Sequence, residues 1–201
     1  MVKNIILDIG GVLADFRWSG LMRDLGFSQA TIDDLNKGVM SSPLWNEFDR
    51  EAIEPIKVIE EFKKNNPKYV REIDLFFENI KDIVVQFDYT EPFIKELKDK
   101  GYQVYLLSNY PSFVFELHIK DKYNFLPYID GKIVSGYVKM IKPEPEIYQL
   151  LLQTYHLKAE ECVFLDDKQE NIEAALEMGM KGIVFHSYEQ AREELKQWIT
   201  L

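Results

Sequence analysis

Three short apolar runs along the chain end on small or acidic polar residues. The first run ends at Asp8, the second at Ser108 and Asn109, and the third at Asp166 and Asp167. Such runs, separated by helix-like segments, are typical of parallel strands that are buried on both faces of a sheet. Because ligands bind beyond the carboxyl ends of such strands, we expect these five polar residues to share one crevice.

The hydrophobic pattern changes between residues 15 and 87. Apolar residues recur there at helical spacing, with few strand-like runs between them. From residue 88 onward the alternation of helix-like and strand-like segments returns. The pattern therefore predicts a doubly wound, Rossmann-like α/β core with a parallel sheet, built from residues 1–14 and 88–201, and an α-helical insert formed by residues 15–87, which the family resemblance described below identifies as a helical cap.

Turn and breaker residues place the elements of the second core segment. Gly101 and Gly179 are expected to end helices, and Pro111 to open one. Strands are expected at 102–107, 162–165 and 182–185, an extended segment at 132–138, and helices at 91–100, after Pro111, at 145–156, at 168–178 and at 188–199.

Length and charge narrow the function. A chain of 201 residues can bury one sizeable core with a small insert. Its 24 Lys and Arg residues against 34 Asp and Glu residues give a net charge of −10, and no basic cluster appears. Nucleic acid is therefore not an expected partner, because backbone phosphates need a positive surface.

Neither the N-terminus nor the single cysteine indicates export. The first apolar run is interrupted by Asp8, too early for a signal peptide or a membrane span, so we expect a cytoplasmic protein without a membrane partner. Cys162 has no partner for a disulfide and is expected to be a small buried hydrophobe. His118, His156 and His186 show no ligand spacing and are expected in surface or core roles. No feature specifies an oligomeric state.

The acidic residues that follow the strands need a counter-charge. Asp8, Asp166 and Asp167 in one crevice would repel one another and lose hydration unless a cation joined them. Ligand sets made only of oxygen select a hard ion such as Mg²⁺. The residues alone therefore predict a metal site at this edge of the sheet.

Four motifs, in order along the chain, resemble the haloacid dehalogenase-like hydrolase superfamily. They are Ile5–Asp15 (IILDIGGVLAD), Leu106–Asn109 (LLSN), Lys142–Pro143, and Val163–Asp167 (VFLDD) followed by Asn171. Each motif is weak alone, but their common order and their positions at strand ends make the match specific. The resemblance implies a phosphohydrolase with a mobile helical cap that acts on a small phosphorylated metabolite.

The resemblance also assigns chemistry to the first and last motifs. Asp8 would attack phosphorus and form an aspartyl-phosphate, which divides one difficult displacement into two easier ones. The second oxygen of Asp8, the backbone carbonyl of Gly10, and the Asp166 and Asp167 carboxylates would bind Mg²⁺. Asn171 would support this site by orienting Asp167 or a water molecule.

The two middle motifs would bind the phosphate. By resemblance, Ser108 and Asn109 would hydrogen-bond the transferring phosphoryl oxygens, and Lys142 would neutralise charge on the phosphate and on Asp8 in the transition state. Ordinary structural roles stay open as alternatives. Asp8 could simply end a strand, Ser108 and Asn109 could cap a helix, Lys142 could be a solvated surface charge, and one acid of the doublet could cap the following helix.

Cap residues are harder to assign. Trp45, Phe48 and Arg50 lie where the family places specificity groups. Aromatic residues at this spacing more often pack in a core, and an arginine is more often a solvated charge, so contact with substrate is the lesser expectation for all three.

Gly10 departs from the most common family pattern, Asp-x-Asp, in which the second Asp is the general acid and base. Such help is worth about 10²–10⁴-fold in rate. The Asp-x-Gly pattern here is similar to that of bacterial glucose-1-phosphatases, which implies a sugar phosphate with a good leaving group as one candidate substrate. Asp15 is a candidate for the missing acid.

Two other functions stay open on the sequence. A 2-haloacid dehalogenase would use the same nucleophilic Asp, Ser-Asn pair and Lys without any metal, but that enzyme class does not keep an acidic pair in the fourth motif. The Asp166-Asp167 doublet therefore favours phosphate. The second alternative is a catalytically idle phosphosugar-binding protein, in which Gly10 marks lost turnover.

Overall fold

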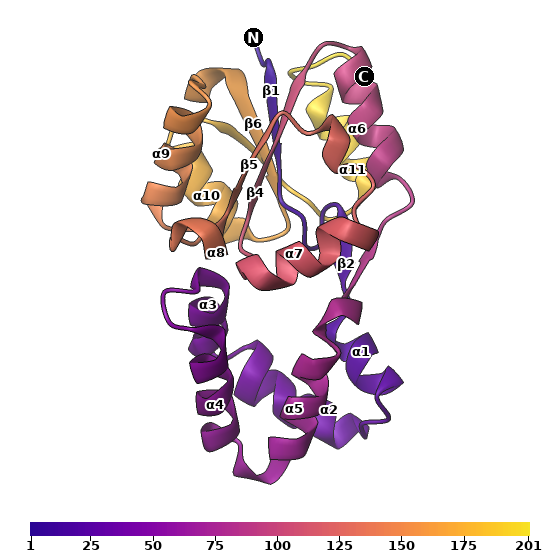
Figure 1. The fold of residues 1–201 in the computed structure, drawn as a ribbon. Coiled ribbons are helices and arrows are strands. Elements are labelled where there is room, and N and C mark those ends of the chain that lie inside the picture. The colour runs from indigo at the N-terminus through magenta and orange to yellow at the C-terminus, as the bar shows by residue number, and fades with distance from the viewer.

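A five-stranded parallel sheet forms the centre of the protein in our computed structural model, which describes residues 1–201 (Figure 1). Its strand order is β5-β4-β1-β6-β7. The strands are β1 (Asn4–Leu7), β4 (Gln103–Ser108), β5 (Gly131–Val134), β6 (Cys162–Asp166) and β7 (Lys181–Val184). The chain adds strands on one side of β1 and then on the other, so its direction of winding reverses at β1. The prediction of a doubly wound α/β fold is confirmed.

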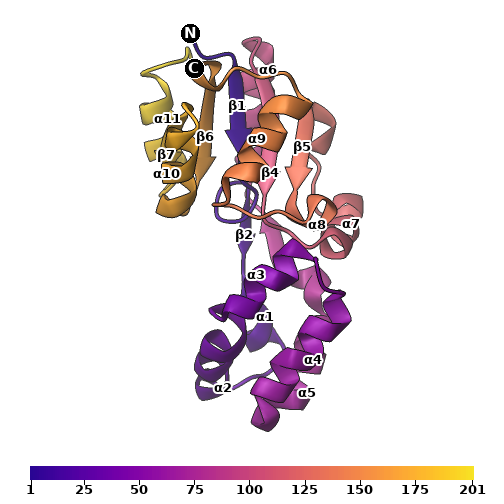
Figure 2. The ribbon, with the colours of Figure 1, turned by 90° about the vertical axis from the view of Figure 1, so that its left-hand side faces the viewer.

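Helices cover both faces of the sheet (Figures 1 and 2). Alternate residues of β1 enter separate apolar clusters, with Ile5 and Leu7 in one and Ile6 in the other. The first cluster includes α6 (Thr90–Asp99), α7 (Ser112–Asp121) and α11 (Tyr188–Leu195), and the second includes α9 (Pro145–Thr154) and α10 (Gln169–Glu177). Continuous apolar strands are stable here because neither face meets water.

A helical body lies beyond the carboxyl ends of the sheet (Figures 1 and 2). It contains α1 (Trp18–Asp24), α2 (Gln29–Leu35), α3 (Pro43–Arg50), α4 (Pro55–Asn65) and α5 (Val70–Glu78). Two antiparallel strands, β2 (Ala14–Phe16) and β3 (Val84–Gln86), form its connection to the core. That residues 15–87 form a cap that moves against the core stays a prediction.

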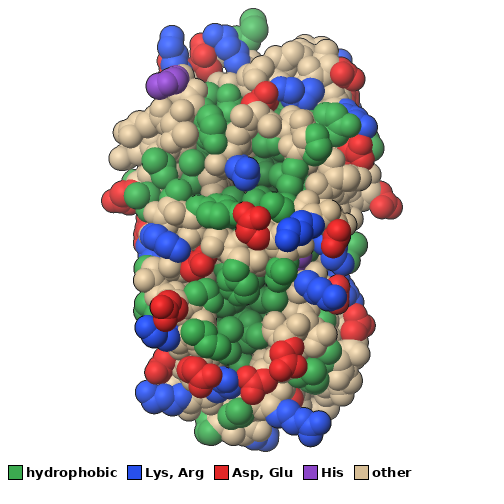
Figure 3. Space-filling view, viewed as in Figure 1, with side chains coloured by type: hydrophobic (Ala, Val, Ile, Leu, Met, Phe, Trp, Pro, Cys, Tyr) green, Lys and Arg blue, Asp and Glu red, His purple; other side chains and the backbone are tan.

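Short helical segments complete the connections. They are a π-helical turn at Asn36–Met40, 3₁₀ turns at Pro67–Tyr69, Ile80–Asp82, Leu126–Tyr128 and Ala159–Glu161, and α8 (Ser135–Val138). No helix combines the length and the apolar character needed to cross a membrane. Lysine and arginine side chains are interspersed with acidic ones on the face shown in Figure 3, without a continuous basic patch.

Most of the elements expected in the core occur within two residues of their predicted ends, but two differ. The predicted helix at 188–199 ends at Leu195. The extended segment expected at 132–138 is a strand only to Val134, and its second half is the helical turn α8. The chain turns there because the Ser135 hydroxyl accepts a hydrogen bond from the Tyr110 backbone N–H (2.7 Å) and donates to the Asp49 carbonyl (2.6 Å). These long-range contacts override the strand propensity of the segment.

The burial of the sheet on both faces predicts a strong contrast between two leucines. Leu165 in β6 is 0% exposed, whereas Leu176 in α10 is 51% exposed. Leu165→Ala should lower the free energy of unfolding by about 2–5 kcal/mol, because it leaves a cavity. Leu176→Ala should change that free energy by about 0.5 kcal/mol or less. Denaturant unfolding followed by circular dichroism measures both, and similar losses would contradict the packing described.

Candidate active site

The reversal of winding at β1 brings the polar strand ends together. Asp8 directly follows β1, while Ser108 ends β4 and Asp166 ends β6, the two strands that flank β1. Oxygen atoms of Asp8, Asp166 and Asp167 lie within 4.8 Å of one another. The expected crevice therefore exists, and open parallel sheets bind ligands at this position.

Lys142 connects the acidic residues. Its side chain is only 1% exposed, and Nζ lies 2.6 Å from Asp166 Oδ2 and 3.0 Å from Asp8 Oδ1. Nζ also donates to the Leu107 carbonyl (2.8 Å). The alternative of a solvated surface charge is thus wrong. Burial opposes the charged form of this amine, but the two aspartates outweigh that effect and raise the pKa of Lys142. Lys142 is a permanent cation in the crevice.

Asn109 holds the loop that carries Lys142. Its Nδ2 donates to the Lys142 carbonyl (2.9 Å), and its Oδ1 accepts from the Lys142 backbone N–H (2.8 Å). These two bonds fix the loop to the end of β4. The Asn109 amide therefore has one N–H left for a ligand, and its predicted contact with phosphate stays a prediction.

Asp166 accepts three hydrogen bonds from the protein, which leaves one of its four acceptor sites free. It is 0% exposed, and its Oδ1 accepts from the Lys168 backbone N–H (2.8 Å) and from Asn171 Nδ2 (2.9 Å). The prediction that Asn171 orients Asp167 or a water is corrected, because Asn171 reaches back from the first turn of α10 to Asp166. Asp166 thus accepts the hydrogen bonds offered at the start of α10, and Asp167 faces the pocket.

The crevice holds more negative than positive charge. Burial is the main cause that raises the pKa of Asp8, with Lys142 opposing the shift and Asp166 adding to it. Burial, followed by repulsion from Asp8 and Asp166, raises the pKa of Asp167 to about 6. Asp8 Oδ1 also accepts no well-directed hydrogen bond, although the Lys142 ammonium is near. Three carboxylates with one buried cation fit a divalent metal ion, as the sequence predicted.

The turn after Asp8 has two glycines with different roles. Gly11 has a φ of +73°, and a Cβ there would lie 2.6 Å from Asp167 Oδ2, so only glycine allows this close approach. A Cβ at Gly10 would meet nothing nearer than the Cβ of Phe16 at 3.9 Å. The Gly10 carbonyl accepts no backbone hydrogen bond, which leaves it free for the predicted metal contact.

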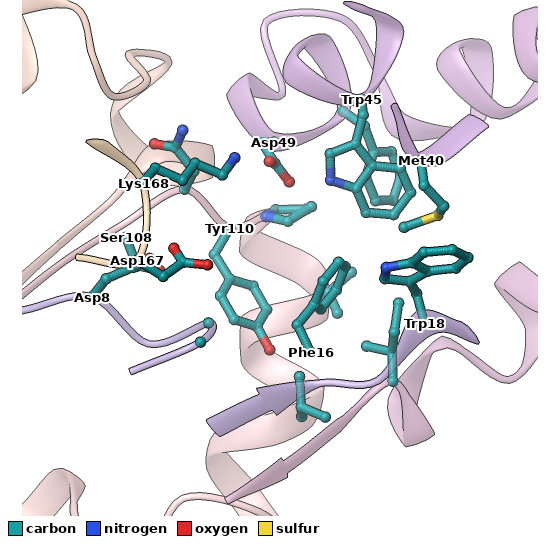
Figure 4. A pocket seen from close by; sticks show the side chains of 18 of the residues that line it. Asp8, Phe16, Trp18, Met40, Trp45, Asp49, Ser108, Tyr110, Asp167 and Lys168 are labelled. Carbon is teal, nitrogen blue, oxygen red and sulfur yellow. The ribbon is translucent and has the colours of Figure 1, made fainter. Parts of the chain in front are cut away.

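A pocket of about 450 Å³ opens between the crevice and the helical body. Figure 4 shows its two sides, with Asp8, Ser108 and Asp167 on one and aromatic residues on the other. The apolar side is formed by Phe16, Trp18, Met40, Trp45, Phe48 and Val114. No pattern in the sequence predicted Phe16, Trp18 or Met40 at this position. A pocket with a polar floor and an apolar wall suits a small molecule that has one charged end.

The three residues considered as specificity groups, Trp45, Phe48 and Arg50, pack in the helical body or contact the core. Trp45 and Phe48 pack against Phe77 and also line the pocket. Arg50 is not a solvated charge, because it forms a bidentate pair with Glu144 of the core (2.7 and 2.6 Å).

The histidines and the cysteine have the structural roles expected of them. His118 is buried and hydrogen-bonded to the Tyr110 hydroxyl, and His156 and His186 are exposed. Burial raises the pKa of the Cys162 thiol to about 11, which fits an inert core residue.

Comparison with known proteins identifies the family. The model of the haloacid dehalogenase-like hydrolases matches residues 2–179. The chain belongs to this hydrolase family. The matched segment of this hydrolase includes Asp8, Ser108 and Asp166, which lie at the carboxyl edge of the sheet.

Two relatives span most of the hydrolase. A sesquiterpene phosphatase from Aspergillus oryzae is 29% identical over 90% of this chain and 88% of its own length. A D-ribitol-5-phosphate phosphatase from Bacteroides thetaiotaomicron is 26% identical and is covered over 97% of both chains.

Two solved structures share the fold. A haloacid dehalogenase family enzyme from Bacteroides thetaiotaomicron, in complex with magnesium and inorganic phosphate, has a TM-score of 0.73 and 22% identity, and the match covers 95% of this chain and 99% of that one. An L-2-haloacid dehalogenase from Xanthobacter autotrophicus has a TM-score of 0.70 and 14% identity, and the match covers 100% of this chain and 85% of that one. The fold alone therefore does not separate phosphate from halide chemistry.

The raised pKa of Asp167 predicts pH-dependent metal binding. At about pH 7.5, a saturating concentration of Mg²⁺ should stabilise the folded protein by about 2–4 kcal/mol. At about pH 5, below the Asp167 pKa of about 6, the effect should be much smaller because protons compete with the metal. Without metal, the pH trend has the opposite sign. Because folding raises the pKa of the Asp167 carboxyl group, the folded protein should lose stability as the pH rises from about 4 to 6. Thermal melts with and without Mg²⁺ measure both trends.

The matched variant for this test is Asp167→Asn. It should remove most of the Mg²⁺-induced rise in melting temperature and flatten the metal-free pH dependence. A Mg²⁺ effect of equal size at both pH values, or one that survives in the variant, would show that Asp167 does not bind the metal.

Proposed function

We propose that this hydrolase is a Mg²⁺-dependent phosphomonoesterase whose nucleophile is Asp8. The observation that carries the proposal is the placement of Asp8 beside the buried Lys142 ammonium (3.0 Å) and within 4.8 Å of two further carboxylates. Two relatives named as phosphatases, and a similar structure that holds magnesium and inorganic phosphate, support it.

Each residue of the site would have a separate role in phosphoryl transfer. An Asp8 oxygen attacks phosphorus while Lys142 neutralises charge that develops on the transferring group. The Ser108 hydroxyl and the remaining Asn109 N–H lie at the end of β4, where they would bind phosphoryl oxygens. Asp8, the Gly10 carbonyl and Asp167, with the last free lone pair of Asp166, would hold Mg²⁺, and the ion would supply the positive charge that a phosphate dianion needs.

The same geometry argues against the two alternatives. Dehalogenation needs a nucleophile and a cation, which Asp8 and Lys142 alone would provide. Dehalogenation would have no role for Asp167, the third carboxylate in a cluster whose oxygen atoms lie within 4.8 Å of one another. An idle binding protein would not need Asp8 aligned with Lys142, and apart from Gly10 no expected catalytic group is missing.

The apolar wall of the pocket favours one class of ester. Trp18, Met40 and Trp45 offer few hydrogen-bonding groups to a sugar, but they can bury an aliphatic or aromatic group. We therefore favour a phosphate ester of a largely apolar alcohol over the sugar phosphate that the Asp-x-Gly pattern implied. The sesquiterpene phosphatase among the relatives supports this choice.

Asp8→Asn provides the direct test of the nucleophile. The amide has the same shape but is a far poorer nucleophile, so phosphate release should fall by at least about 10³-fold. The variant should keep the wild-type circular dichroism spectrum. Excess chelator should also stop the wild-type reaction. Phosphate release that continues in chelator, or metal-independent release of chloride from 2-chloropropionate, would favour the dehalogenase.

The substrate class is tested with matched esters. Geranyl phosphate should have a higher kcat/KM than glucose 1-phosphate, because its chain can occupy the apolar wall. Trp18→Ala should lower kcat/KM for geranyl phosphate by about 10-fold or more, the usual effect of losing apolar contact in a pocket. The same variant should change kcat/KM for glycerol 2-phosphate little. A preference for the sugar ester, or equal losses for both esters in the variant, would contradict an apolar substrate.

A further inference from the structure

Asp49 is a carboxyl group that none of the family motifs includes. It lies near the end of α3 in the helical body and lines the same pocket as Asp8 and Lys142. Figure 4 shows its side chain directed into the pocket, between Lys168 and the aromatic wall formed around Trp45. This is the border between the polar floor and the apolar wall.

The position of this border has a chemical meaning. If the phosphate lies over Asp8 and the apolar alcohol against Trp45, the oxygen that joins them must lie between the two. A group at the border can therefore reach the oxygen that departs when Asp8 attacks. Asp49 occupies this position and is half-buried, whereas Asp15, the acid considered from the sequence, also lines the pocket but is exposed on β2.

Three contacts fix the end of α3 to the core. Arg50 pairs with Glu144 through two hydrogen bonds, and Glu51 Oε2 accepts from the Ser112 backbone N–H (2.7 Å). The Asp49 carbonyl accepts from the Ser135 hydroxyl (2.6 Å). Three successive residues are thus tied to the core, and Asp49 is held in place by its neighbours while its own carboxyl group stays free.

A glycine permits this close approach. A Cβ on Gly136 would lie 2.3 Å from the Ser112 nitrogen and 2.5 Å from Glu51 Oε2. Any larger residue there would push the end of α3 away from the core. The fold therefore provides room for the contact that positions Asp49.

The surroundings of the Asp49 carboxyl group favour its protonated form, so that a substantial fraction of it is neutral near pH 7. Burial is the main cause that raises its pKa to about 7, Lys168 and Lys142 oppose the shift, and Asp8 adds to it. No hydrogen bond to the side chain stabilises the carboxylate. A neutral carboxyl group at this pH can donate a proton.

We propose that Asp49 is the general acid for the departing ester oxygen and so replaces the carboxyl group that Gly10 lacks. The inference rests on the proposed phosphatase function. As an Asp8 oxygen forms its bond to phosphorus, the phosphorus–ester oxygen bond breaks, and its electron pair goes to that oxygen. The oxygen takes the proton of Asp49 and leaves as the alcohol.

The second half of the reaction restores both groups. Water attacks the phosphorus of the aspartyl-phosphate and gives a proton to the Asp49 carboxylate. The bond between phosphorus and Asp8 breaks, which releases inorganic phosphate and returns Asp8 to its carboxylate form. Proton and charge balance over the cycle.

The test compares leaving groups in single-turnover experiments with the wild type and Asp49→Asn. For an alkyl ester such as geranyl phosphate, release of the alcohol should slow by about 10²–10⁴-fold in the variant. For 4-nitrophenyl phosphate, whose leaving group needs little protonation, it should slow by about 10-fold or less. The wild-type rate for the alkyl ester should fall as pH rises above about 7, where Asp49 ionises, and the variant should lose this dependence.

Two further variants make the test specific. Glu54→Gln removes an exposed acid of the same helical body, paired only with Lys57, and should leave both esters unaffected. Gly10→Asp, which the open space at Gly10 accommodates, should restore alkyl ester turnover to the Asp49→Asn protein.

Each other outcome overturns the proposal. Equal slowing of both esters would mean that Asp49 only supports the structure. Unchanged rates, or selective loss of the alkyl ester in Asp15→Asn instead, would place the acid elsewhere. A wild type that releases no phosphate from either ester would reject the phosphatase function itself, whereas turnover that depends on Asp8 and ignores Asp49 would reject this inference alone.

Discussion

The buried ammonium of Lys142 is the interaction on which the site depends. Taking an amine and two carboxylates out of water costs several kcal/mol for each ion, and only close pairing offsets that cost. Here the amine lies 2.6 Å from Asp166 and 3.0 Å from Asp8, and the Leu107 carbonyl accepts its remaining hydrogen bond. Three strands and one loop must meet at one point to make this cluster, so the order of the sheet and the chemistry of the site are two results of one arrangement.

The charges of the cluster are not balanced by the protein alone, and this imbalance explains the chemistry. Burial is the main cause that raises the pKa values of Asp8 and Asp167, and repulsion from the neighbouring carboxylates, which the amine does not fully balance, adds to it. A divalent cation and a phosphate group together bring the charge that the crevice lacks and the substrate that it would otherwise repel. Asp166 anchors Lys142 and the start of α10, while Asp8 and Asp167 face the ligand. The acidic doublet thus serves structure and metal binding at once.

The sequence predicted those parts that depend on local pattern. Strand ends, glycine turns and the polar residues after each strand are local, so the sheet and the meeting of Asp8, Ser108 and Asp166 followed from them. The place of Lys142 in the crevice was expected only from the family resemblance. The prediction that Asn171 orients Asp167 was wrong, because a side chain in the first turn of a helix can reach either of two adjacent acids. The pairing of Arg50 with Glu144 and the position of Asp49 were not predictable, since they join residues 94 positions apart in one case and separate bodies in the other. Apolar residues that line a pocket have the same spacing as those that fill a core, so the apolar wall around Trp18 was not predictable from the sequence either.

The central claim is that Asp8 carries the phosphoryl group during turnover. The most direct measurement mixes the protein with Mg²⁺ and a phosphate ester, quenches the reaction in acid within the first turnover, and locates any added phosphoryl group by peptide mass spectrometry. The account predicts one phosphoryl group on Asp8, formed as fast as the alcohol is released. Release of the alcohol with Asp8 unmodified, or with the phosphoryl group on another residue, would contradict it.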